Sequence, residues 1–476
     1  MLPSNFTAAT VADLIADINA ANAAGGTNTI TLTAPTNSAY VITAADNTTN
    51  GANGLPVISG GRHHLAADNL TIIGNGDTIE RSTGSGTSAF RLFDLASGAS
   101  LTLENLTLQN GLAFGSGSAA EGGAIYNQGT LILSGATVQN NEAEGSNGAN
   151  ARQKNGGTGQ DAAGGGIWSS GSLTLENGTM VQNNTALGGN GGNSLQSHGG
   201  NGGIAFGAGV DIAGGAGNIA GGTLSGNVAQ GGNGGSGVLG GASGNYYANY
   251  GYAAPGIGGG VSVASGTVQL TGATVNSNYA NGGVRPFIYS GYGNGGGIWV
   301  ADGSVTLSGD TVDSNFGGYA RYRDSGGGVY VAGGTVNLSN DTLDSNTSDF
   351  GGGVYVGGGT VNLSSDTVNS NTAFGYGGGV YVGGGAVNLS SDTVNSNFAG
   401  QSGGGLYIAG GSTVTFCNDT VAFNSVSDTG GGMYIESGTS VYIDSFTVAN
   451  TINNTDSFGL NGSFANIVGP YTLSNC

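Results

Sequence analysis

Apolar and polar residues alternate in short runs along this chain, and the runs return at a regular interval. The most regular run is a Gly triplet followed by an apolar, an aromatic and a second apolar residue. Its copies begin at Gly295, Gly326, Gly351, Gly377, Gly403 and Gly430, with weaker copies at Gly122, Gly164, Gly207 and Gly258. From Gly326 onward the copies are 25, 26, 26 and 27 residues apart, and Gly-rich insertions lengthen the earlier intervals to between 31 and 51 residues. Alternation with a period of two predicts β-strands.

Two more apolar runs follow each copy, as in residues 361–363 and 368–371. Three short strands per 25 residues, with no helical period after the N-terminal segment, are typical of one turn of a parallel β-solenoid. We expect Val354 and Val356 to point inward and Tyr355 outward. The sequence therefore predicts an all-β fold, a single right-handed parallel β-helix of roughly a dozen coils stacked about 4.8 Å apart.

Stacked coils place equivalent side chains in columns, and two polar columns are visible. The Asn column is Asn141, Asn184, Asn227, Asn278, Asn315, Asn346, Asn371, Asn397 and Asn424. An amide can donate to one coil and accept from the next, so we expect an internal ladder. The Asp column is Asp310, Asp341, Asp366, Asp392 and Asp419. Its repetition favours capping of turns by hydrogen bonds from backbone N–H groups, and a line of weak Ca²⁺ sites is the alternative. The Gly triplets are expected to supply positive φ and close backbone approach at a corner.

Two motifs carry a resemblance to known proteins. Gly-Gly-Ala-Ile-Tyr at residues 122–126, with the Thr-Val-x-x-Asn that closes most coils, resembles the paired motifs of chlamydial polymorphic outer-membrane protein repeats. More broadly, residues 30 to 450 are similar to the pectate-lyase-like right-handed β-helix superfamily. The start of the chain resembles the N-terminal segment of bacterial surface β-helix proteins. The resemblance implies the fold and a surface location, and it also implies an enzymatic alternative, because the superfamily includes polysaccharide lyases, galacturonases and pectin esterases.

The ends of the chain differ from the repeats. Residues 10–24 have a helical period, with a capping arrangement of Thr10 and Asp13 and a stop at Gly25, and predict an amphipathic capping helix before the first strand. We therefore divide the chain into an N-terminal cap (1–29), the β-helix (30–449) and a C-terminal tail or cap (450–476) without an evident capping helix. Neither a signal peptide nor a transmembrane run is visible.

The chain contains two cysteines, Cys417 and Cys476. A disulfide between them would tie the C-terminal tail to the last coils and would imply an oxidising compartment. Two unrelated thiols are the alternative.

Aromatic residues form the candidate binding surfaces. An outward strip follows the Gly triplets and contains Tyr126, Trp168, Trp299, Tyr330, Tyr355, Tyr381, Tyr407 and Tyr434, interrupted by Asp211 and Ser262. Exposed rings can stack on sugars, or stack on each other to stiffen the sheet. The insertions leave the coil at one corner and carry Tyr246, Tyr250, Tyr289, Tyr292, Tyr322, Arg285, Arg321 and Arg323. Rigid aromatics on an adaptable backbone are typical of recognition surfaces, and shielding of the coil is the alternative.

Composition narrows the chemistry. The 476 residues include 101 Gly, 8 Lys or Arg and 28 Asp or Glu, for a net charge of −20. This balance excludes nucleic acid and disfavours an anionic membrane as partners. His63, His64 and His198 have neither metal-ligand nor catalytic-triad spacing, so we expect no enzyme and no cofactor beyond the weak Ca²⁺ alternative. An outward Thr column (Thr311, Thr342, Thr367, Thr393, Thr420 and Thr447) suggests ice binding, as the weakest candidate.

These observations predict an extracellular or cell-surface structural protein of adhesin or fibre type. Its loop-bearing side and aromatic strip would contact glycans, other proteins or further copies of the chain, by head-to-tail or lateral assembly into filaments. The alternative function is a carbohydrate-active β-helix enzyme, either a polysaccharide lyase or a hydrolase.

Overall fold

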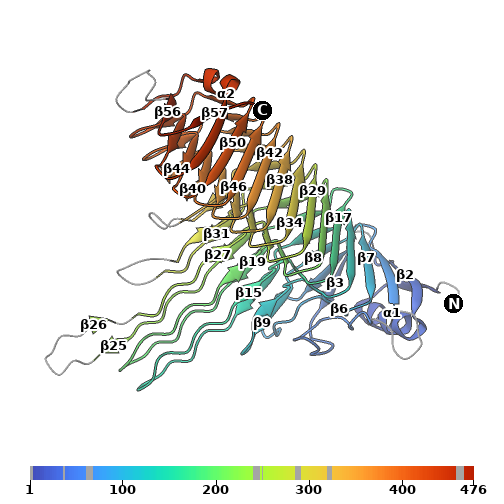
Figure 1. Cartoon of the computed structure of the whole chain (residues 1–476). Helices are drawn as coiled ribbons and strands as arrows, with labels where there is room; N and C mark the ends of the chain where they lie inside the picture. The colour runs from blue at the N-terminus through green and yellow to red at the C-terminus, as the bar shows by residue number, and fades with distance from the viewer. Residues whose placement is uncertain are drawn as a thin grey trace. The chain divides into compact units, whose positions relative to one another are not determined.

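The computed structural model describes residues 4–35, 38–59, 68–239, 247–248, 250–284, 291–318, 324–456 and 466–476. The chain divides into two compact units, residues 1–255 with 283–291 (unit 1) and residues 256–282 with 292–476 (unit 2). Within each unit, short strands stack in parallel on the strands of the next coil (Figure 1). The all-β, parallel β-helix prediction is therefore confirmed in each unit.

Strands lie on four faces in each unit, one more than the sequence predicted, although the first coils of unit 1 have no described strand on face 4. Face 1 follows the Gly triplet, face 2 and face 3 come next, and face 4 follows the Asn column. The strands of face 4 were missed because the sequence after each Asn, such as Thr-Ala-Phe-Gly-Tyr in residues 372–376, varies from coil to coil. In unit 2 a fourth strand nevertheless pairs with its neighbours, as β40 (Thr347–Phe350) does with β44 (Thr372–Tyr376).

The strands of unit 1 lie on the same four faces. Face 1 contains β6 (Phe93–Leu95), β11 (Ile125–Asn127), β16 (Ile167–Ser169) and β21 (Val210–Ile212). Face 2 contains β1 (Ser4–Ala8), β2 (Gly26–Leu32), β4 (Asp68–Ile73), β7 (Ser100–Glu104), β12 (Thr130–Ser134), β17 (Ser172–Glu176) and β22 (Ala216–Ala220). Face 3 contains β3 (Ala39–Ile42), β5 (Thr78–Arg81), β8 (Thr107–Gln109), β13 (Thr137–Gln139), β18 (Met180–Gln182) and β23 (Thr223–Ser225). Face 4 contains β9 (Leu112–Gly115), β14 (Glu142–Gly145), β19 (Thr185–Leu187) and β24 (Val228–Gln230). Shorter strands are β10 (Ala120–Glu121), β15 (Ala162–Ala163), β20 (Ala205–Phe206) and the antiparallel pair β25 (Val238–Leu239) and β26 (Tyr247–Ala248).

Unit 2 is more regular. Face 1 contains β28 (Val261–Val263), β33 (Ile298–Val300), β37 (Val329–Val331), β41 (Val354–Val356), β45 (Val380–Val382), β49 (Leu406–Ile408), β53 (Met433–Ile435) and β56 (Ile467–Val468). Face 2 contains β29 (Thr267–Thr271), β34 (Ser304–Ser308), β38 (Thr335–Ser339), β42 (Thr360–Ser364), β46 (Ala386–Ser390), β50 (Thr413–Cys417), β54 (Ser440–Asp444) and β57 (Thr472–Ser474). Face 3 contains β30 (Thr274–Asn276), β35 (Thr311–Asp313), β39 (Thr342–Asp344), β43 (Thr367–Asn369), β47 (Thr393–Asn395), β51 (Thr420–Ala422) and β55 (Thr451–Ile452). Face 4 contains β31 (Tyr279–Asn281), β36 (Phe316–Gly317), β40, β44, β48 (Phe398–Ala399) and β52 (Ser425–Val426). β27 (Gly256–Ile257) pairs with β32 (Gly293–Asn294).

Apolar side chains fill the inside of the coils. Val354, Val356 and Val361 are fully buried, as the alternation predicted, and Tyr355 is only half-buried. Equivalent residues are aligned from strand to strand, so that Leu338, Leu363 and Leu389 form one continuous column. Like side chains stacked at one spacing pack equally well in every coil.

The predicted Asn ladder is present in both units. Asn371 shows the pattern, since its Oδ1 accepts the N–H and Nδ2–H groups of Asn346, at 2.9 and 3.0 Å. Its Nδ2 donates to Asn397 Oδ1 at 3.0 Å and to the Leu343 carbonyl at 2.9 Å. The structure extends the ladder beyond the predicted residues to Asn454. Each buried amide is thereby satisfied, as burial of a polar group requires.

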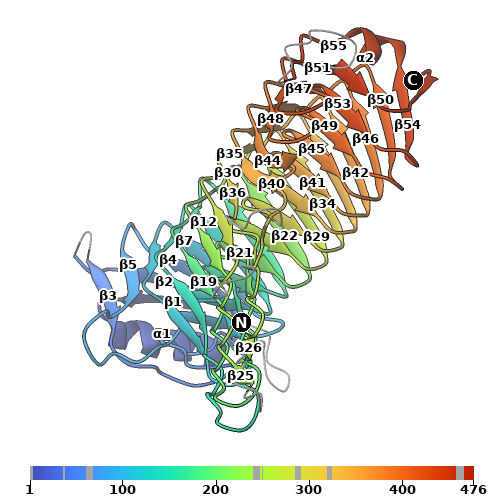
Figure 2. The ribbon, with the colours of Figure 1, turned by 90° about the vertical axis from the view of Figure 1, so that its left-hand side faces the viewer.

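The N-terminal helix is confirmed, but it does not precede the first strand. α1 (Val11–Ala24) is capped by Thr10, buries Leu14, Ile18 and Ala21 and ends at Gly25. β1 lies before it and pairs with β2, and Figure 2 shows α1 near both strands. A five-residue strand in a Ser/Thr/Asn context gives a weak alternation signal, which explains the omission.

A second helix was also not predicted. α2 (Ser445–Ala449) follows β54, and Asp444 caps it by accepting the Phe446 and Thr447 N–H groups. Five residues are too few to show a helical period. In the described part of the chain, no helix is both long and apolar enough to span a membrane.

Candidate functional site

Three Gly-rich extensions leave the coil of unit 1 between face 4 and the Gly triplet. Each runs outward and returns, with outgoing segments 145–151, 188–195 and 231–237 and returning segments 156–161, 199–204 and 250–255. Figure 1 shows these extensions running side by side away from the faces of unit 1. We call this structure the Gly platform.

The backbone of the Gly platform is hydrogen-bonded with a period of three residues. Gly188 N–H donates to the carbonyl of Gln230, the residue before the next outgoing segment, and Gly189 N–H donates to the Gln160 carbonyl of a returning segment, at 2.9 and 2.8 Å. Asn190 N–H, the third of the triplet, donates to Asn147 Oδ1 at 2.7 Å. All three backbone donors are thus satisfied by other segments. A three-residue period without internal bonds is typical of packed polyproline-II-type chains.

Glycine is required here because the backbones approach closely. None of the glycines from Gly188 to Gly203 has positive φ. A Cβ at Gly200 would lie 1.8 Å from the Gly157 carbonyl oxygen, and a Cβ at Gly192 would lie 2.2 Å from that of Ala149. The platform is therefore a two-layered backbone sandwich without a side-chain core. The Gly-Gly-Asn triplets at 188–193 and 199–201 are the sequence signal that could have revealed it.

The third position of each triplet forms the surface of the platform. In the outgoing layer the exposed residues at these positions are Asn147, Asn150, Asn190, Asn193, Asn233 and Ser236. The returning layer exposes Asn201 and Tyr252, and Tyr252 N–H donates to Asn201 Oδ1 at 2.9 Å. Every third residue of such a chain lies on one side, so each layer presents one aligned surface.

The predicted loop-recognition residues are placed only in part. Tyr250 is half-buried in the returning layer, and Tyr292 in unit 2 is 40 % exposed. The other predicted residues, Tyr246, Tyr289, Tyr322, Arg285, Arg321 and Arg323, lie outside the described residues. Tyr252, which is 72 % exposed, is the described aromatic residue that the platform presents most fully.

The aromatic strip forms a stacked row in unit 2, which we call the Tyr row (Trp299, Tyr330, Tyr355, Tyr381, Tyr407 and Tyr434). The rings of Tyr330, Tyr355, Tyr381 and Tyr407 follow one another with centroids 4.8, 5.0 and 5.1 Å apart and interplanar angles of 6° or less. Tyr434 continues the stack at 5.2 Å. Trp299 lies in register with Tyr330 on the neighbouring strand. In unit 1, Tyr126 and Trp168 stack at 4.4 Å, and Asp211 lies next to Trp168 in register.

The Tyr row is more covered than an outward position predicts. Tyr407 is 7 % exposed, and Phe350 and Tyr376 of face 4 pack against Tyr381 and Tyr407 respectively. Burial raises the pKa of Tyr330 and of Tyr381 to about 12. The Tyr407 hydroxyl donates to the Glu436 carboxylate. Because neighbouring rings cover both faces of each inner Tyr, the geometry favours the stiffening role over stacking on sugars.

The Asp column caps turns, as expected. Asp366 Oδ1 accepts the Asp341 N–H at 2.7 Å, and its Oδ2 accepts the Ser364 N–H at 2.9 Å. The other members repeat this pattern, and all are at most 1 % exposed. Burial raises the pKa of Asp366 and of Asp392 to about 7, against the opposing effect of the backbone N–H groups. No cluster of three or more potential metal-ligating His, Cys, Asp or Glu residues occurs among the residues that the structure describes.

Thr447 does not belong to the outward Thr column. It is fully buried in α2, where its Oγ1 accepts the Asp419 N–H at 2.9 Å and continues the Asp column. The flat Thr array proposed for ice binding therefore loses a member.

A buried ionic cluster in unit 1 was not predicted. Arg91 is 5 % exposed, stacks over the Tyr126 ring at 4.9 Å and donates to Asn53 Oδ1. Asp94 is fully buried, and burial raises its pKa although Arg91 opposes that shift. Asn53 Nδ2 also donates to Asp94 Oδ2 at 3.3 Å. Residues 47–58 pack over Arg91 and Asp94. Because the segments that form the cluster are far apart in sequence, no sequence motif predicts it.

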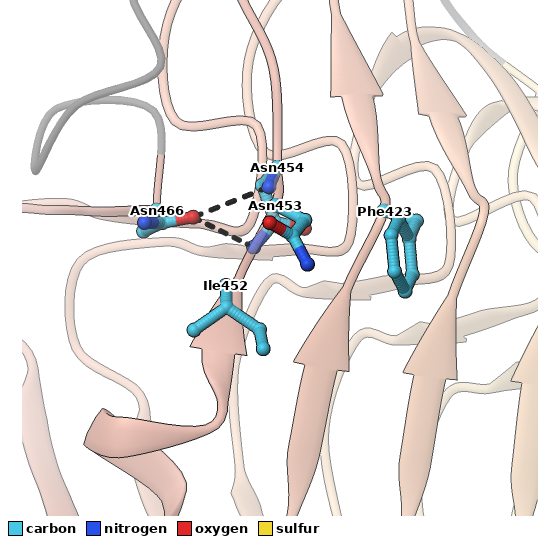
Figure 3. Close-up of a pocket in the computed structure, with 5 residues that line it drawn as sticks. All are labelled: Phe423, Ile452, Asn453, Asn454 and Asn466. Carbon is cyan, nitrogen blue, oxygen red and sulfur yellow. Dashed lines mark hydrogen bonds between the residues drawn. The ribbon is translucent and has the colours of Figure 1, made fainter.

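A pocket of 560 Å³ lies at the C-terminal end of the Asn ladder, between Phe423, Ile452, Asn453, Asn454 and Asn466 (Figure 3). Asn466 Oδ1 accepts two hydrogen bonds from Asn454, which ends the ladder. Phe423 has a φ of 57° and is 59 % exposed, a rare conformation for a bulky residue. The lining is uncharged.

The remaining predicted residues are the cysteines and histidines. Cys417 and Cys476 form a disulfide with a Cα–Cα distance of 5.5 Å, which joins the C-terminal residues to β50. His198 is exposed and lies, along the chain, between the outgoing segment 188–195 and the returning segment 199–204. His63 and His64 lie outside the described residues.

Comparison of the chain with protein-family models, with curated proteins and with solved structures gave no match.

Proposed function

We propose that the chain is an extracellular or cell-surface structural protein of adhesive type, and that the Gly platform is its contact surface. The observation that carries the proposal is the backbone hydrogen bonding that joins the segments of the platform to one another. A chain that fixes about forty residues in a backbone sandwich outside the coil must offset a large loss of conformational entropy. A rigid surface favours binding to a partner, because a preorganised surface loses little conformational entropy when the partner binds.

Other features support an exterior location. The disulfide between Cys417 and Cys476 would be stable in an oxidising compartment. With only 8 Lys or Arg among 476 residues, the chain offers few sites to proteases that cleave at basic residues. The finer relationship to chlamydial polymorphic outer-membrane protein repeats and to the pectate-lyase-like superfamily is part of this proposal, as is assembly with further copies of the chain.

The proposal is tested by locating and imaging the protein. Antibody labelling of intact cells of the source organism is expected to detect the chain without permeabilisation, and purified chain immobilised on beads is expected to retain target cells. Electron microscopy distinguishes isolated rods from filaments. Labelling only after permeabilisation, together with beads that retain no cells, would overturn the proposal.

A further inference from the structure

The outgoing layer of the Gly platform presents a regular array of carboxamides. Its exposed third positions are Asn147, Asn150, Asn190, Asn193, Asn233 and Ser236, which we call the Asn face. The outgoing segments are aligned by backbone bonds such as Gly191 N–H to the Asn233 carbonyl at 2.8 Å. Neighbouring segments therefore repeat Asn one coil apart, about 4.8 Å, except that Ser236 replaces Asn in the third segment. Along a segment the repeat is three residues, about 9 Å.

Each amide of the Asn face is held by its oxygen, which accepts a backbone N–H group of the neighbouring segment. Asn190 Oδ1 accepts the Asn233 N–H at 2.9 Å, and Asn193 Oδ1 accepts the Ser236 N–H at 2.7 Å. Within the described residues, the Nδ2 groups of Asn190 and Asn193 donate to no protein atom. The Asn face is therefore a fixed array of neutral hydrogen-bond donors.

The Asn face also differs in charge from the rest of the molecule. The segments 145–151, 188–195 and 231–237 contain no Asp, Glu, Lys or Arg, although the chain has a net charge of −20. An uncharged donor array gives no electrostatic attraction to polyanions or to basic peptides. The Asn face is complementary to a polymer whose repeating units carry uncharged oxygen atoms that accept hydrogen bonds.

We infer that the Asn face binds neutral polysaccharide, with the Asn Nδ2 groups donating to hydroxyl and ring oxygens of an extended glycan lying across the outgoing segments. This inference rests on the proposed function and names the ligand class of the same platform. Many weak bonds to a repeating polymer add through multivalency, so a shallow surface without a pocket is sufficient.

The test uses Asn→Asp substitutions, because an aspartate keeps the oxygen that accepts the backbone N–H and removes the outward donor. The variant is Asn190→Asp with Asn193→Asp in the full chain. The control is Asn388→Asp, which replaces an exposed amide by a carboxylate on face 2 of unit 2, outside the platform. Affinity electrophoresis is run in gels that contain a soluble neutral β-1,3-glucan or, for comparison, polygalacturonate.

The wild-type chain is expected to be retarded by the neutral glucan and not by polygalacturonate. The double variant is expected to lose at least about tenfold in affinity, which corresponds to about 1.4 kcal/mol, and the control is expected to bind as wild type. Equal loss in the control, unchanged binding in the double variant, or wild-type binding to polygalacturonate alone would overturn the inference. If the double variant does not fold, as judged by circular dichroism, Asn147→Asp with Asn150→Asp replaces it.

Failure of this inference is distinguishable from failure of the proposed function. If the double variant retains cell binding in the bead assay and loses nothing in the gel, the inference fails and the adhesive role stands. If wild-type beads retain no cells and intact cells carry no label, the proposed function itself fails.

Discussion

Unit 2 and the Gly platform of unit 1 both stack repeated segments of the chain, but side chains form the contacts in unit 2 and the backbone forms them in the platform. In unit 2, columns of Val, Leu, Asn, Asp and Tyr side chains fill and cover the coils. In the platform most of the first and second positions of the triplets are Gly, and the backbone of each segment packs directly on its neighbours. The comparison shows that repetition alone does not specify a packing mode, because the side chain at the repeated position decides whether a column or a backbone contact forms.

We expect the stability of the platform to be more sensitive than that of any other region to a substitution that adds a side chain at a Gly. Gly200→Val is expected to destabilise it by at least about 4 kcal/mol, since a Cβ 1.8 Å from the Gly157 oxygen exceeds ordinary overpacking. Limited proteolysis and chemical unfolding would measure the loss. Gly84→Ala is the control, because the nearest atom to its Cβ is a Ser82 side-chain oxygen at 3.2 Å. A stable, protease-resistant Gly200→Val chain would contradict the backbone sandwich.

The Asn ladder should dominate the stability of single coils in unit 2. Asn371→Ala removes four hydrogen bonds and leaves buried backbone and amide groups of Asn346 and Leu343 unpaired, for an expected loss of about 3 kcal/mol. Asn362→Ala provides the contrast. Asn362 donates to Asn337 Oδ1 and accepts from Asn388 Nδ2 on the surface of face 2, where water can replace both bonds, so its loss should cost below about 1 kcal/mol. Thermal unfolding of both variants measures the difference, and equal losses would refute the special role of the interior ladder.

The Asp column predicts a pH dependence that belongs to unit 2. The ordinary pKa of an Asp is 3.8, and burial raises that of Asp366 to about 7 and that of Asp310 to about 6. The folded state therefore binds more protons than the unfolded state between these values. The resulting stabilisation is fully present below about pH 4 and is lost as the pH rises through 6 to 7.

The free energy of unfolding by denaturant should be lower by at least about 3 kcal/mol at pH 8 than at pH 4.5, since a pKa difference of one corresponds to about 1.4 kcal/mol. Asp366→Asn should reduce this difference, whereas Asp344→Asn, which removes a carboxylate from face 3 of the neighbouring coil, should not. A free energy of unfolding that rises from pH 4.5 to pH 8 would show that the backbone N–H groups outweigh burial.

The Tyr row should give the smallest effect. Tyr381→Leu interrupts the stack between Tyr355 and Tyr407 and is expected to cost about 1 kcal/mol, while Tyr381→Phe keeps the stack and should be nearly neutral. Near-ultraviolet circular dichroism would follow the loss of stacking. Neither variant should change retardation by neutral glucan, and a loss of retardation in Tyr381→Leu would return the row to the list of binding surfaces.

The sequence alone determined the repeat, the inward Val and Leu columns, the Asn ladder and the Asp column. Each follows from a period of about 25 residues, because stacked coils bring equivalent residues such as Asn346 and Asn371 into contact whatever the details of the corners. The strands of face 4, β1 and α2 were missed, since each is too short or too variable to show a period.

Tertiary structure decided what the Gly-rich segments and the aromatic strip do. Composition could not show that Gly192 and Gly200 lie against carbonyl groups of other extensions, because which segments meet depends on where each extension leaves the coil. Likewise, the alternation of apolar and polar residues predicted that the Tyr row points outward. It did not predict that Phe350 and Tyr376 pack against the row, because the strands of face 4 were not predicted. Contacts between consecutive coils follow from the period of the sequence, because stacking brings equivalent residues together. Contacts between non-equivalent segments depend on the folded path of the chain and cannot be predicted from that period.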